Sequence, residues 1–294
     1  MNKLMNLLSI DKSYLHNIGI TEEDLRENGD YDSDMDDNRE LEELKKKDNR
    51  PKQPIKIKKL EIKPLFTDDE SYAEAPNEFL FKPPFSLILV GIRGAGKTTM
   101  VANVLKPYAD YFDTIYVFSP TASLDISFKK MAEMLKIDKK NIFNKYSESR
   151  LTKIMKMIKK KNKNTPQNEK HRTLIIFEDI IDDLPKSISK SVMNKLAFNC
   201  RHYNISFIIL SQYFKKVPIT IRNNTNSWAL YGIENMVERK KIFQELCGSL
   251  GKNYFEELYD DVTSEPYQAL TINYQQKHPY RYTKNFNEVI MKDN

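Results

Sequence analysis

The segment from Gly91 to Thr98 matches the phosphate-binding pattern G-x-x-x-x-G-K-[ST] at every fixed position. A loop that wraps a triphosphate must turn tightly and bring backbone N–H groups against phosphate oxygens, which side chains at the glycine positions would block. Lys97 would then reach the β and γ phosphates of ATP, while the Thr98 hydroxyl would ligate Mg²⁺. We expect the nucleotide contacts to come from Gly91, Gly94, Ala95, Gly96, Lys97, Thr98 and Thr99.

The residues on both sides of this loop have the pattern that a phosphate site requires. Residues 85–90 form a short apolar run typical of a buried parallel strand, and residues 98–105 are typical of a helix. The loop would therefore lie at the positive N-terminus of a helix, where anions bind. The alternative is a glycine-rich turn with a chance lysine, and the flanking pattern favours the phosphate site.

A second apolar run, residues 173–177, leads directly into two carboxylates, Glu178 and Asp179. In ATPases with a phosphate loop, an acidic residue at the tip of the strand beside the loop holds the hydration shell of Mg²⁺, and an adjacent acid can activate water. The simpler interpretation is a strand that ends in solvated acids, since Asp182 and Asp183 follow. The phosphate loop upstream favours a metal site that combines Thr98 and Glu178.

A third apolar run, residues 205–210, is followed by Gln212. A glutamine amide can hydrogen-bond both a phosphate oxygen and an attacking water, so Gln212 is a candidate sensor of the γ phosphate. Lys215 and Lys216 come shortly afterwards. They are candidate DNA contacts, and they are equally compatible with solvated loop charges.

The remaining apolar patterns predict further elements of an α/β core. We expect strands at residues 114–118, 227–231 and 268–274, and helices at residues 127–135 and 149–160. The single tryptophan, Trp228, falls in one of these strands and is expected in the core rather than on the surface.

Composition limits the class of protein. The chain has 294 residues, enough for one substantial α/β core, and no apolar stretch approaches the ~20 residues of a membrane helix. The N-terminus lacks the pattern of a signal peptide, so we expect a soluble intracellular protein. The two cysteines and four histidines show no metal-ligand spacing, so neither zinc nor a disulfide is predicted.

Charge divides the chain into three parts. Residues 19–44 hold twelve Asp or Glu against two Arg, although the net charge of the chain is +6. We therefore expect an acidic, largely disordered arm at 1–44, a basic linker at 45–80 and an ATPase domain at 81–294. The basic balance of the remainder favours polyanionic partners, although a skewed base composition of the parent genome would also raise the lysine content.

The order of these motifs resembles that of the FtsK–HerA superfamily. More closely, it is similar to the poxvirus-type genome-packaging ATPases of large DNA viruses and virophages. The resemblance rests on the glycine loop, the pair Glu178-Asp179, Arg201-His202 before an apolar strand, Gln212, and the Ile-Arg-Asn-Asn stretch at 221–224. It covers roughly residues 80–275 and implies a RecA-like α/β core with a mostly parallel central sheet flanked by helices.

The resemblance also implies roles for single residues. Lys97 and Thr98 would bind phosphate and Mg²⁺, Glu178 would organise the metal, Asp179 would polarise water, and Gln212 would sense the γ phosphate. Members of the superfamily often have Asp-Glu or Asp-Asp at the strand tip, whereas this chain has Glu followed by Asp. Asp179 could therefore be the metal residue instead, with the base drawn from Asp182 or Asp183.

An arginine finger from a neighbouring subunit is a further implication, because it neutralises charge in the transition state of phosphoryl transfer. It predicts a ring, usually a hexamer in this superfamily. Arg201 and Arg222 are both candidates, and each also has an ordinary interpretation as a salt-bridge partner.

The resemblance implies a Mg²⁺-dependent ATPase motor that moves double-stranded DNA into a viral capsid. The expected partners are duplex DNA without sequence preference, further copies of the chain in a ring, and capsid, portal or membrane proteins that bind the N-terminal arm. The expected location is the virion or a viral factory in the host cytoplasm. The alternatives are a nucleotide-controlled assembly module with little turnover, and a replicative helicase or a kinase with the same loop.

Overall fold

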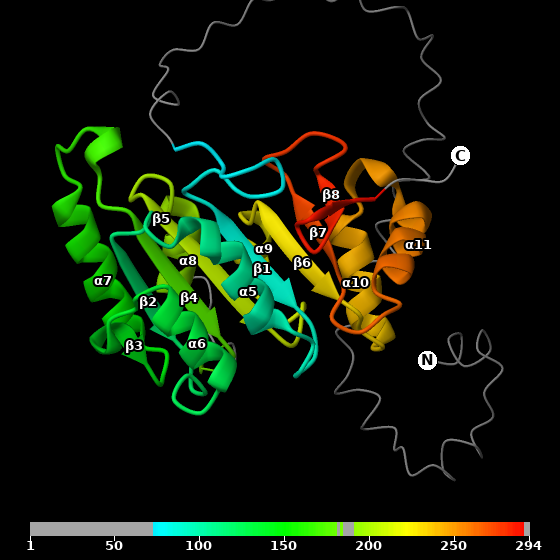
Figure 1. Cartoon of the computed structure of the whole chain (residues 1–294), viewed down its shortest axis with the longest axis horizontal. Helices are drawn as coiled ribbons and strands as arrows, with labels where there is room; N and C mark the ends of the chain where they lie inside the picture. The colour runs from blue at the N-terminus through cyan, green and yellow to red at the C-terminus, as the bar shows by residue number, and fades with distance from the viewer. Residues whose placement is uncertain (1–72, 181–182, 185–190, 291–294) are drawn as a thin grey trace, which may run out of the picture. The chain divides into compact units, whose positions relative to one another are not determined.

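The structure is a computed structural model that describes residues 73–180, 183–184 and 191–290. The acidic arm expected at 1–44, most of the expected linker, and Asp182 lie outside these residues. The described residues form one mixed sheet with helices on both of its faces (Figure 1). This arrangement confirms the expected α/β fold with a mostly parallel sheet.

The described part of the chain contributes nine strands to this sheet. In chain order they are β1 (Ser86–Val90), β2 (Thr114–Phe118), β3 (Ile142–Phe143), β4 (Thr173–Glu178), β5 (Ile205–Ser211), β6 (Ser227–Tyr231), β7 (Ala269–Asn273), β8 (Tyr282–Lys284) and β9 (Glu288–Val289). The strands predicted at 114–118 and 227–231 have the predicted bounds, and the other four predicted strands differ by one or two residues. Strands β3, β8 and β9 were not predicted.

The α-helices alternate with the parallel strands. They are α5 (Lys97–Leu105), α6 (Ile126–Met134), α7 (Glu148–Lys161), α8 (Val192–Asn199), α9 (Ile219–Asn223), α10 (Met236–Leu246) and α11 (Lys252–Val262). Single 3₁₀ turns lie at Lys106–Tyr108, Lys139–Asn141, Gln167–Glu169 and Gly248–Leu250. Helices α5, α6 and α7 confirm the predicted ones. No helix in the described ranges is both long and apolar enough to cross a membrane.

The strand order is β3-β2-β4-β5-β1-β6-β7-β8-β9, with parallel pairing from β3 to β6 and antiparallel pairing from there to β9. Strand β5 lies between the loop strand β1 and the acidic strand β4, an order that the sequence analysis did not predict. Strand order depends on long-range pairing, which the composition of one strand does not encode. The carboxyl ends of β1, β5 and β4 still meet at one edge, where Val90 pairs with Ser211 and Glu178 pairs with Leu210.

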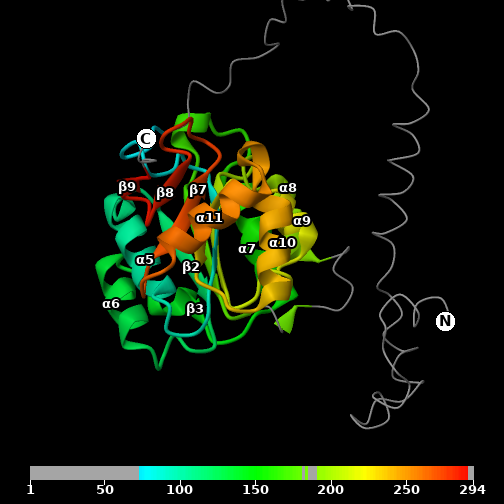
Figure 2. The same ribbon diagram turned by 90° about the vertical axis from the view of Figure 1, so that its right-hand side faces the viewer.

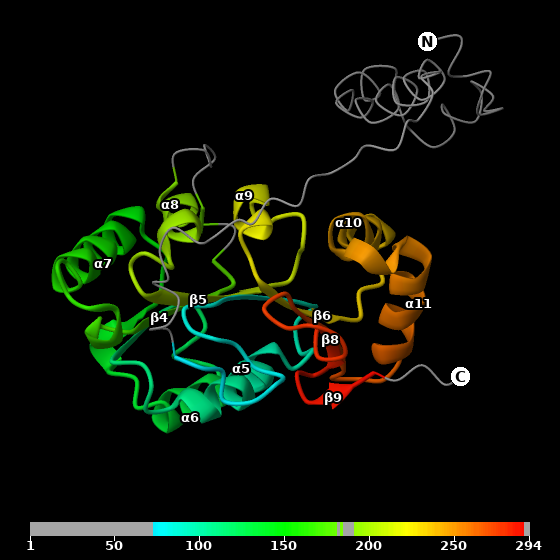
Figure 3. The same ribbon diagram turned by 90° about the horizontal axis from the view of Figure 1, so that it is seen from above.

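Both faces of the sheet are buried, because side chains alternate along each strand. Ile88 and Val90 of β1 pack in a core shared with α7, α8, α10 and α11. Leu87 and Leu89 point the other way, into a core shared with α5 and α6. Figures 2 and 3 show these two helical layers on opposite sides of the sheet. Trp228 is fully buried in the first core, which confirms its predicted place.

The segment before β1 also packs on the sheet. Leu80 and Phe81 are buried in the second core, and the Asn273 amide donates a hydrogen bond to the Leu80 carbonyl at 3.0 Å. The Gln275 side chain both accepts from and donates to the backbone of Lys82, at 2.9 Å in each case. This segment therefore lies beside the end of β7, at the sheet edge opposite the phosphate loop.

The start of the phosphate loop is packed against the last residue of β6. Tyr231 is 2% exposed. A methyl group added at Gly91 would lie 2.7 Å from the Tyr231 Cβ and 3.1 Å from two of its ring carbons. Contacts this short do not occur between carbon atoms in folded proteins, so the backbone would have to move. Gly91 is therefore required by this packing and not only by a phosphate.

We predict that Gly91→Ala destabilises the protein by roughly 1–3 kcal/mol, the usual cost of overpacking a filled core. Gly232→Ala is the matched control, because a methyl group there would lie 3.4 Å from the nearest atom, the Thr263 carbonyl oxygen. Urea unfolding of both variants measures the difference. Equal midpoints for the two variants would show that the Tyr231 contact does not constrain the loop.

Candidate functional site

The phosphate loop turns at two glycines whose backbone is left-handed. Gly94 has a φ of 82° and Gly96 a φ of 94°, values that side chains disfavour. Gly96 is the N-cap of α5, and the helix begins at Lys97. The first N–H groups of α5 therefore point into the loop, as they do in sites that bind phosphate.

Lys97 lies against its own loop. Its Nζ donates hydrogen bonds to the Gly91 carbonyl at 2.7 Å and to the Ile92 carbonyl at 2.9 Å. Burial lowers the pKa of Lys97, and the negative charges of Asp179 and Glu178 oppose this effect. The ammonium group is thus held beside both acids that the sequence singled out.

Glu178 is the buried acid of the site, with 7% of the residue exposed. Its Oε1 accepts a hydrogen bond from the Thr98 hydroxyl at 3.1 Å, and its Oε2 accepts one from the Ser119 hydroxyl at 2.6 Å. Burial raises the pKa of Glu178, while these two hydrogen bonds act in the opposite direction. Thr98 and Glu178, which the sequence predicted as metal ligands, are therefore in direct contact.

Asp179 differs from Glu178 in being exposed at the end of β4. Its backbone is left-handed, with a φ of 48°, and its N–H donates to the Leu210 carbonyl of β5 at 3.2 Å. The Gln212 amide donates to the Asp179 Oδ2 at 3.3 Å. The two residues expected to act on water and on the γ phosphate are thus hydrogen-bonded to each other.

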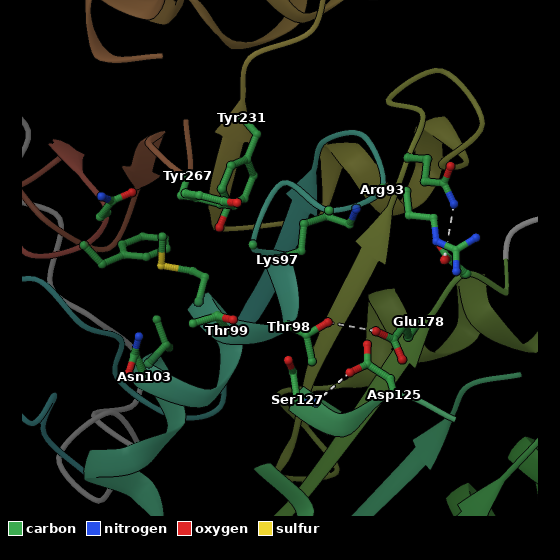
Figure 4. A pocket seen from close by; sticks show the side chains of 18 of the residues that line it. Arg93, Lys97, Thr98, Thr99, Asn103, Asp125, Ser127, Glu178, Tyr231 and Tyr267 are labelled. Carbon is green, nitrogen blue, oxygen red and sulfur yellow. Dashed lines mark hydrogen bonds between the residues drawn. The ribbon is translucent and has the colours of Figure 1, made fainter. Parts of the chain in front are cut away.

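One cavity of about 930 Å³ joins these residues. This volume is in the usual range for small-molecule sites. Most residues predicted to contact the nucleotide or act on it line the cavity: Gly94, Gly96, Lys97, Thr98, Thr99, Glu178, Asp179 and Gln212. Figure 4 shows the cavity from close by, with Lys97 and Thr98 between Glu178 and a pair of tyrosines.

The oxygen atoms of this cavity suit Mg²⁺. The described residues contain no group of three or more His, Cys, Asp or Glu that could hold a metal alone. Mg²⁺ does not require such a group, because proteins usually bind it through one or two side chains together with substrate phosphates. The contact between the Thr98 hydroxyl and the Glu178 carboxylate provides that kind of partial site.

Four predicted residues do not line the cavity: Gly91, Ala95, Arg201 and Arg222. Arg201 is exposed in the turn that precedes β5, at the sheet edge opposite the phosphate loop. Arg222 is 8% exposed, and its guanidinium makes two hydrogen bonds of 2.8 Å to the Glu245 carboxylate. It also donates to the Val217 carbonyl and lies over the Phe214 ring.

The structure also places the three remaining candidates, Asp183, Lys215 and Lys216. Asp183 is exposed and does not line the cavity. Lys215 and Lys216 are exposed in the loop after β5, where the Lys216 ammonium lies 4.5 Å from the centre of the Tyr213 ring. This loop follows the carboxyl end of β5, the same sheet edge as the phosphate loop.

Sequence reasoning missed several residues of the cavity. Thr121 and Asp125 line the wall after β2, and Ser119, which does not itself line the cavity, donates a hydrogen bond to Glu178. Tyr231 and Tyr267 line the opposite side. The carboxyl end of β2 was an available signal for Ser119, because parallel strands end at one edge. No local pattern marked Tyr267, which lies far from the loop in sequence.

The fold and this cavity define a class: phosphate-loop proteins in which a further strand, here β5, separates the loop strand from the acidic strand. The chain belongs to the Poxvirus A32 protein family, whose model matches residues 74–245. This membership confirms the poxvirus-type resemblance that the motifs indicated.

Individual relatives agree with this membership. The chain is 23% identical over 220 residues to the uncharacterized protein 088R of Invertebrate iridescent virus 3, covering 74% of this chain and 78% of the relative. It is 28% identical over 174 residues to the DNA packaging protein OPG160 of Vaccinia virus, covering 54% of this chain and 59% of the relative. The match thus spans little more than half of the vaccinia protein.

A solved structure is also similar to this chain. It is the genome packaging NTPase B204 from Sulfolobus turreted icosahedral virus 2 in complex with AMP. The sequence identity is 14% and the TM-score is 0.49, with 66% of this chain and 95% of that chain covered.

We predict that Glu178→Gln stabilises the protein at pH 7.5. Burial raises the pKa of Glu178, so the folded state favours the protonated acid, and the stability gained from this preference is lost as pH rises through the folded pKa. Glutamine removes the charge and keeps the shape. Thermal unfolding should show a melting temperature at least roughly 2 °C higher at pH 7.5.

The pH dependence checks the origin of that gain. The difference between Glu178→Gln and the unchanged protein should shrink towards pH 4, where the acid is protonated in both states. Asp179→Asn is the control, because this neighbouring acid is exposed. A gain at pH 7.5 that is the same at pH 4 would contradict the electrostatic explanation.

Arg222→Ala should destabilise the protein by roughly 2–3 kcal/mol, because the largely buried Glu245 carboxylate loses both guanidinium hydrogen bonds and keeps the Lys241 ammonium at 3.4 Å. Arg201→Ala is the matched control at an exposed arginine and should change stability much less. Urea unfolding measures both variants. A stable Arg222→Ala protein that has lost only ATP hydrolysis would favour a finger role for Arg222 instead.

Proposed function

We propose that this protein is a Mg²⁺-dependent ATPase that assembles as a ring and moves double-stranded DNA into a viral capsid. One observation carries the ATPase part of the proposal. The Lys97 loop, the Thr98–Glu178 contact and the Asp179–Gln212 contact all lie in one cavity. These are the groups that ATP hydrolysis requires, at the edge of one sheet.

The residues divide into those that bind and those that act on water. The first N–H groups of α5 and the Lys97 ammonium hold the β and γ phosphates, and Thr98 with Glu178 holds Mg²⁺. Bound Mg²⁺ would neutralise charge that develops on the phosphate oxygens. Asp179 orients and deprotonates the attacking water, since it is exposed to the cavity and carries a carboxylate.

Gln212 links hydrolysis to movement. Its amide contacts Asp179 at 3.3 Å, and it directly follows β5, at the start of the loop that contains Lys215 and Lys216. A change in the Gln212 contact when the γ phosphate leaves would move this loop. Lysines there grip duplex DNA through its phosphates, which gives binding that is independent of sequence and sensitive to salt.

The remaining parts of the proposal rest on the family. A relative in the same family is named as a DNA packaging protein, which supports genome packaging for this chain. A finger from the next subunit requires a ring, for which a hexamer is the proposed form. Arg201 is the better finger, because it is exposed whereas Arg222 is 8% exposed. We place the ring in the virion or the viral factory, tethered to capsid or portal proteins by the N-terminal arm.

The test is ATP hydrolysis by the full-length protein with and without long duplex DNA. We expect duplex DNA to stimulate hydrolysis, and Lys97→Ala and Asp179→Asn each to lower the rate by roughly 100-fold or more. Asp179→Asn should still bind ATP, because Lys97 and the loop remain. Asp183→Asn is the comparison at a nearby acid outside the cavity and should retain the rate.

Other outcomes would replace the proposal. ATP binding without turnover under any condition would favour a nucleotide-controlled assembly module. Stimulation by single-stranded DNA alone would point to a helicase. Loss of turnover in Asp183→Asn with retention in Asp179→Asn would move the water-activating role to Asp183.

A further inference from the structure

The cavity extends beyond the phosphate loop, on the side away from the carboxylates. Strands β5 and β4 lie on one side of β1 and bring Gln212, Asp179 and Glu178 to the cavity. Strands β6, β7 and β8 lie on the other side. There the cavity wall is made by Tyr231 at the end of β6 and Tyr267 just before β7.

Figure 4 shows this division directly. Tyr231 and Tyr267 lie together at one end of the cavity, and Glu178 and Asp125 lie at the other, with Lys97 and Thr98 between them. A nucleoside triphosphate has its reactive γ phosphate at one end and its base at the other. If the γ phosphate faces Glu178 and Asp179, the base must lie on the side of the tyrosines.

Tyr267 has the exposure and the place of a stacking residue. It is 70% exposed, although it is a large aromatic side chain in a cavity wall. Its ring lies close to the phosphate loop, because a methyl group at Gly96 would be 3.4 Å from its Cδ1. The face of the ring is thus available beside the loop that holds the phosphates.

The backbone conformation of Tyr267 supports the same role. Its φ is 66°, in the left-handed region that residues other than glycine disfavour. Such a conformation costs on the order of 1 kcal/mol or more and persists where the surrounding structure imposes it, often at binding sites. Here it holds the ring over the cavity rather than in the core.

Helix α5 supplies further polar groups to the cavity, and Figure 4 shows Asn103 on the side away from Glu178. Thr99 and Asn103 are four residues apart, so they lie on one face of the helix, and both line the cavity. The Asn103 amide makes no hydrogen bond with another residue of the described ranges. A carboxamide offers both a donor and an acceptor, which the edge of a purine base can match.

We propose that Tyr267 is the platform on which the purine base of the nucleotide stacks, and that Asn103 hydrogen-bonds the edge of that base. The proposal rests on the proposed function, because it takes the triphosphate to be bound at Lys97. It adds the recognition of the nucleoside, which no residue of the phosphate loop provides. Stacking on an aromatic ring is the common way in which proteins hold a base.

A second explanation of the same geometry is that the Tyr267 ring only supports the phosphate loop. The two explanations differ in what happens to a ligand without a base. Removal of a stacking residue weakens the binding of ATP and leaves the binding of inorganic tripolyphosphate unchanged. Removal of a residue that supports the loop weakens the binding of both ligands equally, because both bind through the same phosphate contacts.

The experiment is calorimetric titration of full-length protein with ATP and, separately, with inorganic tripolyphosphate, each in the presence of Mg²⁺. Tyr267→Ala should weaken ATP binding by about tenfold or more, the usual effect of removing a stacked aromatic ring. Binding of tripolyphosphate should stay within about twofold of the unchanged protein. Asn103→Leu should show the same selectivity with a smaller loss of ATP binding, roughly threefold.

Two control variants sharpen the result. Tyr267→Phe keeps the ring and should bind ATP as the unchanged protein does. Phe198→Ala removes another exposed aromatic ring, which lies on α8 outside the cavity and is 60% exposed. This variant should bind ATP and tripolyphosphate as the unchanged protein does. If the unchanged protein binds ATP but no tripolyphosphate, and Tyr267→Ala loses ATP, the base supplies the affinity and the proposal stands.

Two results would overturn the proposal. One is ATP binding that Tyr267→Ala leaves unchanged. The other is an equal loss of ATP and tripolyphosphate binding in that variant. Failure of the proposed function is distinguishable from both, because it would appear in the unchanged protein as absence of ATP binding or of ATP hydrolysis.

Discussion

The two carboxylate oxygens of Glu178 hold three separate segments of the chain together. A buried carboxylate costs several kcal/mol unless hydrogen bonds replace its water. Thr98 at the start of α5 supplies one donor and Ser119 after β2 supplies the other. Because Thr98 directly follows Lys97, the contact that satisfies the acid also places the phosphate loop against β4. The position of the loop, and hence of the cavity, depends on this interaction.

The strand between the loop and the acid makes this contact possible. The carbonyl groups at the end of β5 accept hydrogen bonds from both neighbours: Leu210 from the Asp179 N–H at 3.2 Å, and Ser211 from the Gly91 N–H at 3.1 Å. The end of β5 therefore holds both the start of the phosphate loop and the end of the acidic strand β4. It also carries Gln212 directly into the gap between them, which explains why Gln212 reaches Asp179.

The sequence was informative where the signal is local and silent where it depends on pairing. The apolar runs predicted β1, β2, β4, β5 and β6, because strands buried on both faces are nearly continuous in Val, Ile, Leu and Phe. The position of β5 between β1 and β4 was missed, since order in a sheet arises from long-range contacts. The sequence left Arg222 open between a finger and a salt-bridge partner for the same reason, because its partner Glu245 lies on another helix.

The direction of the strands accounts for the two unlike ends of the cavity. Parallel strands bring only their carboxyl ends to the edge of the loop, so residues on that side must follow a strand, as Gln212 and Asp179 do. Strand β7 runs antiparallel to β6, with Tyr231 paired to Ala269, and β8 reverses again, with Leu270 paired to Lys284. The same edge therefore receives the start of β7, preceded by Tyr267, and the end of β8, followed by Phe286. The hydrogen bonds of Glu178 come from Thr98, Ser119 and Thr121, so the tyrosine side can vary without removing any of them.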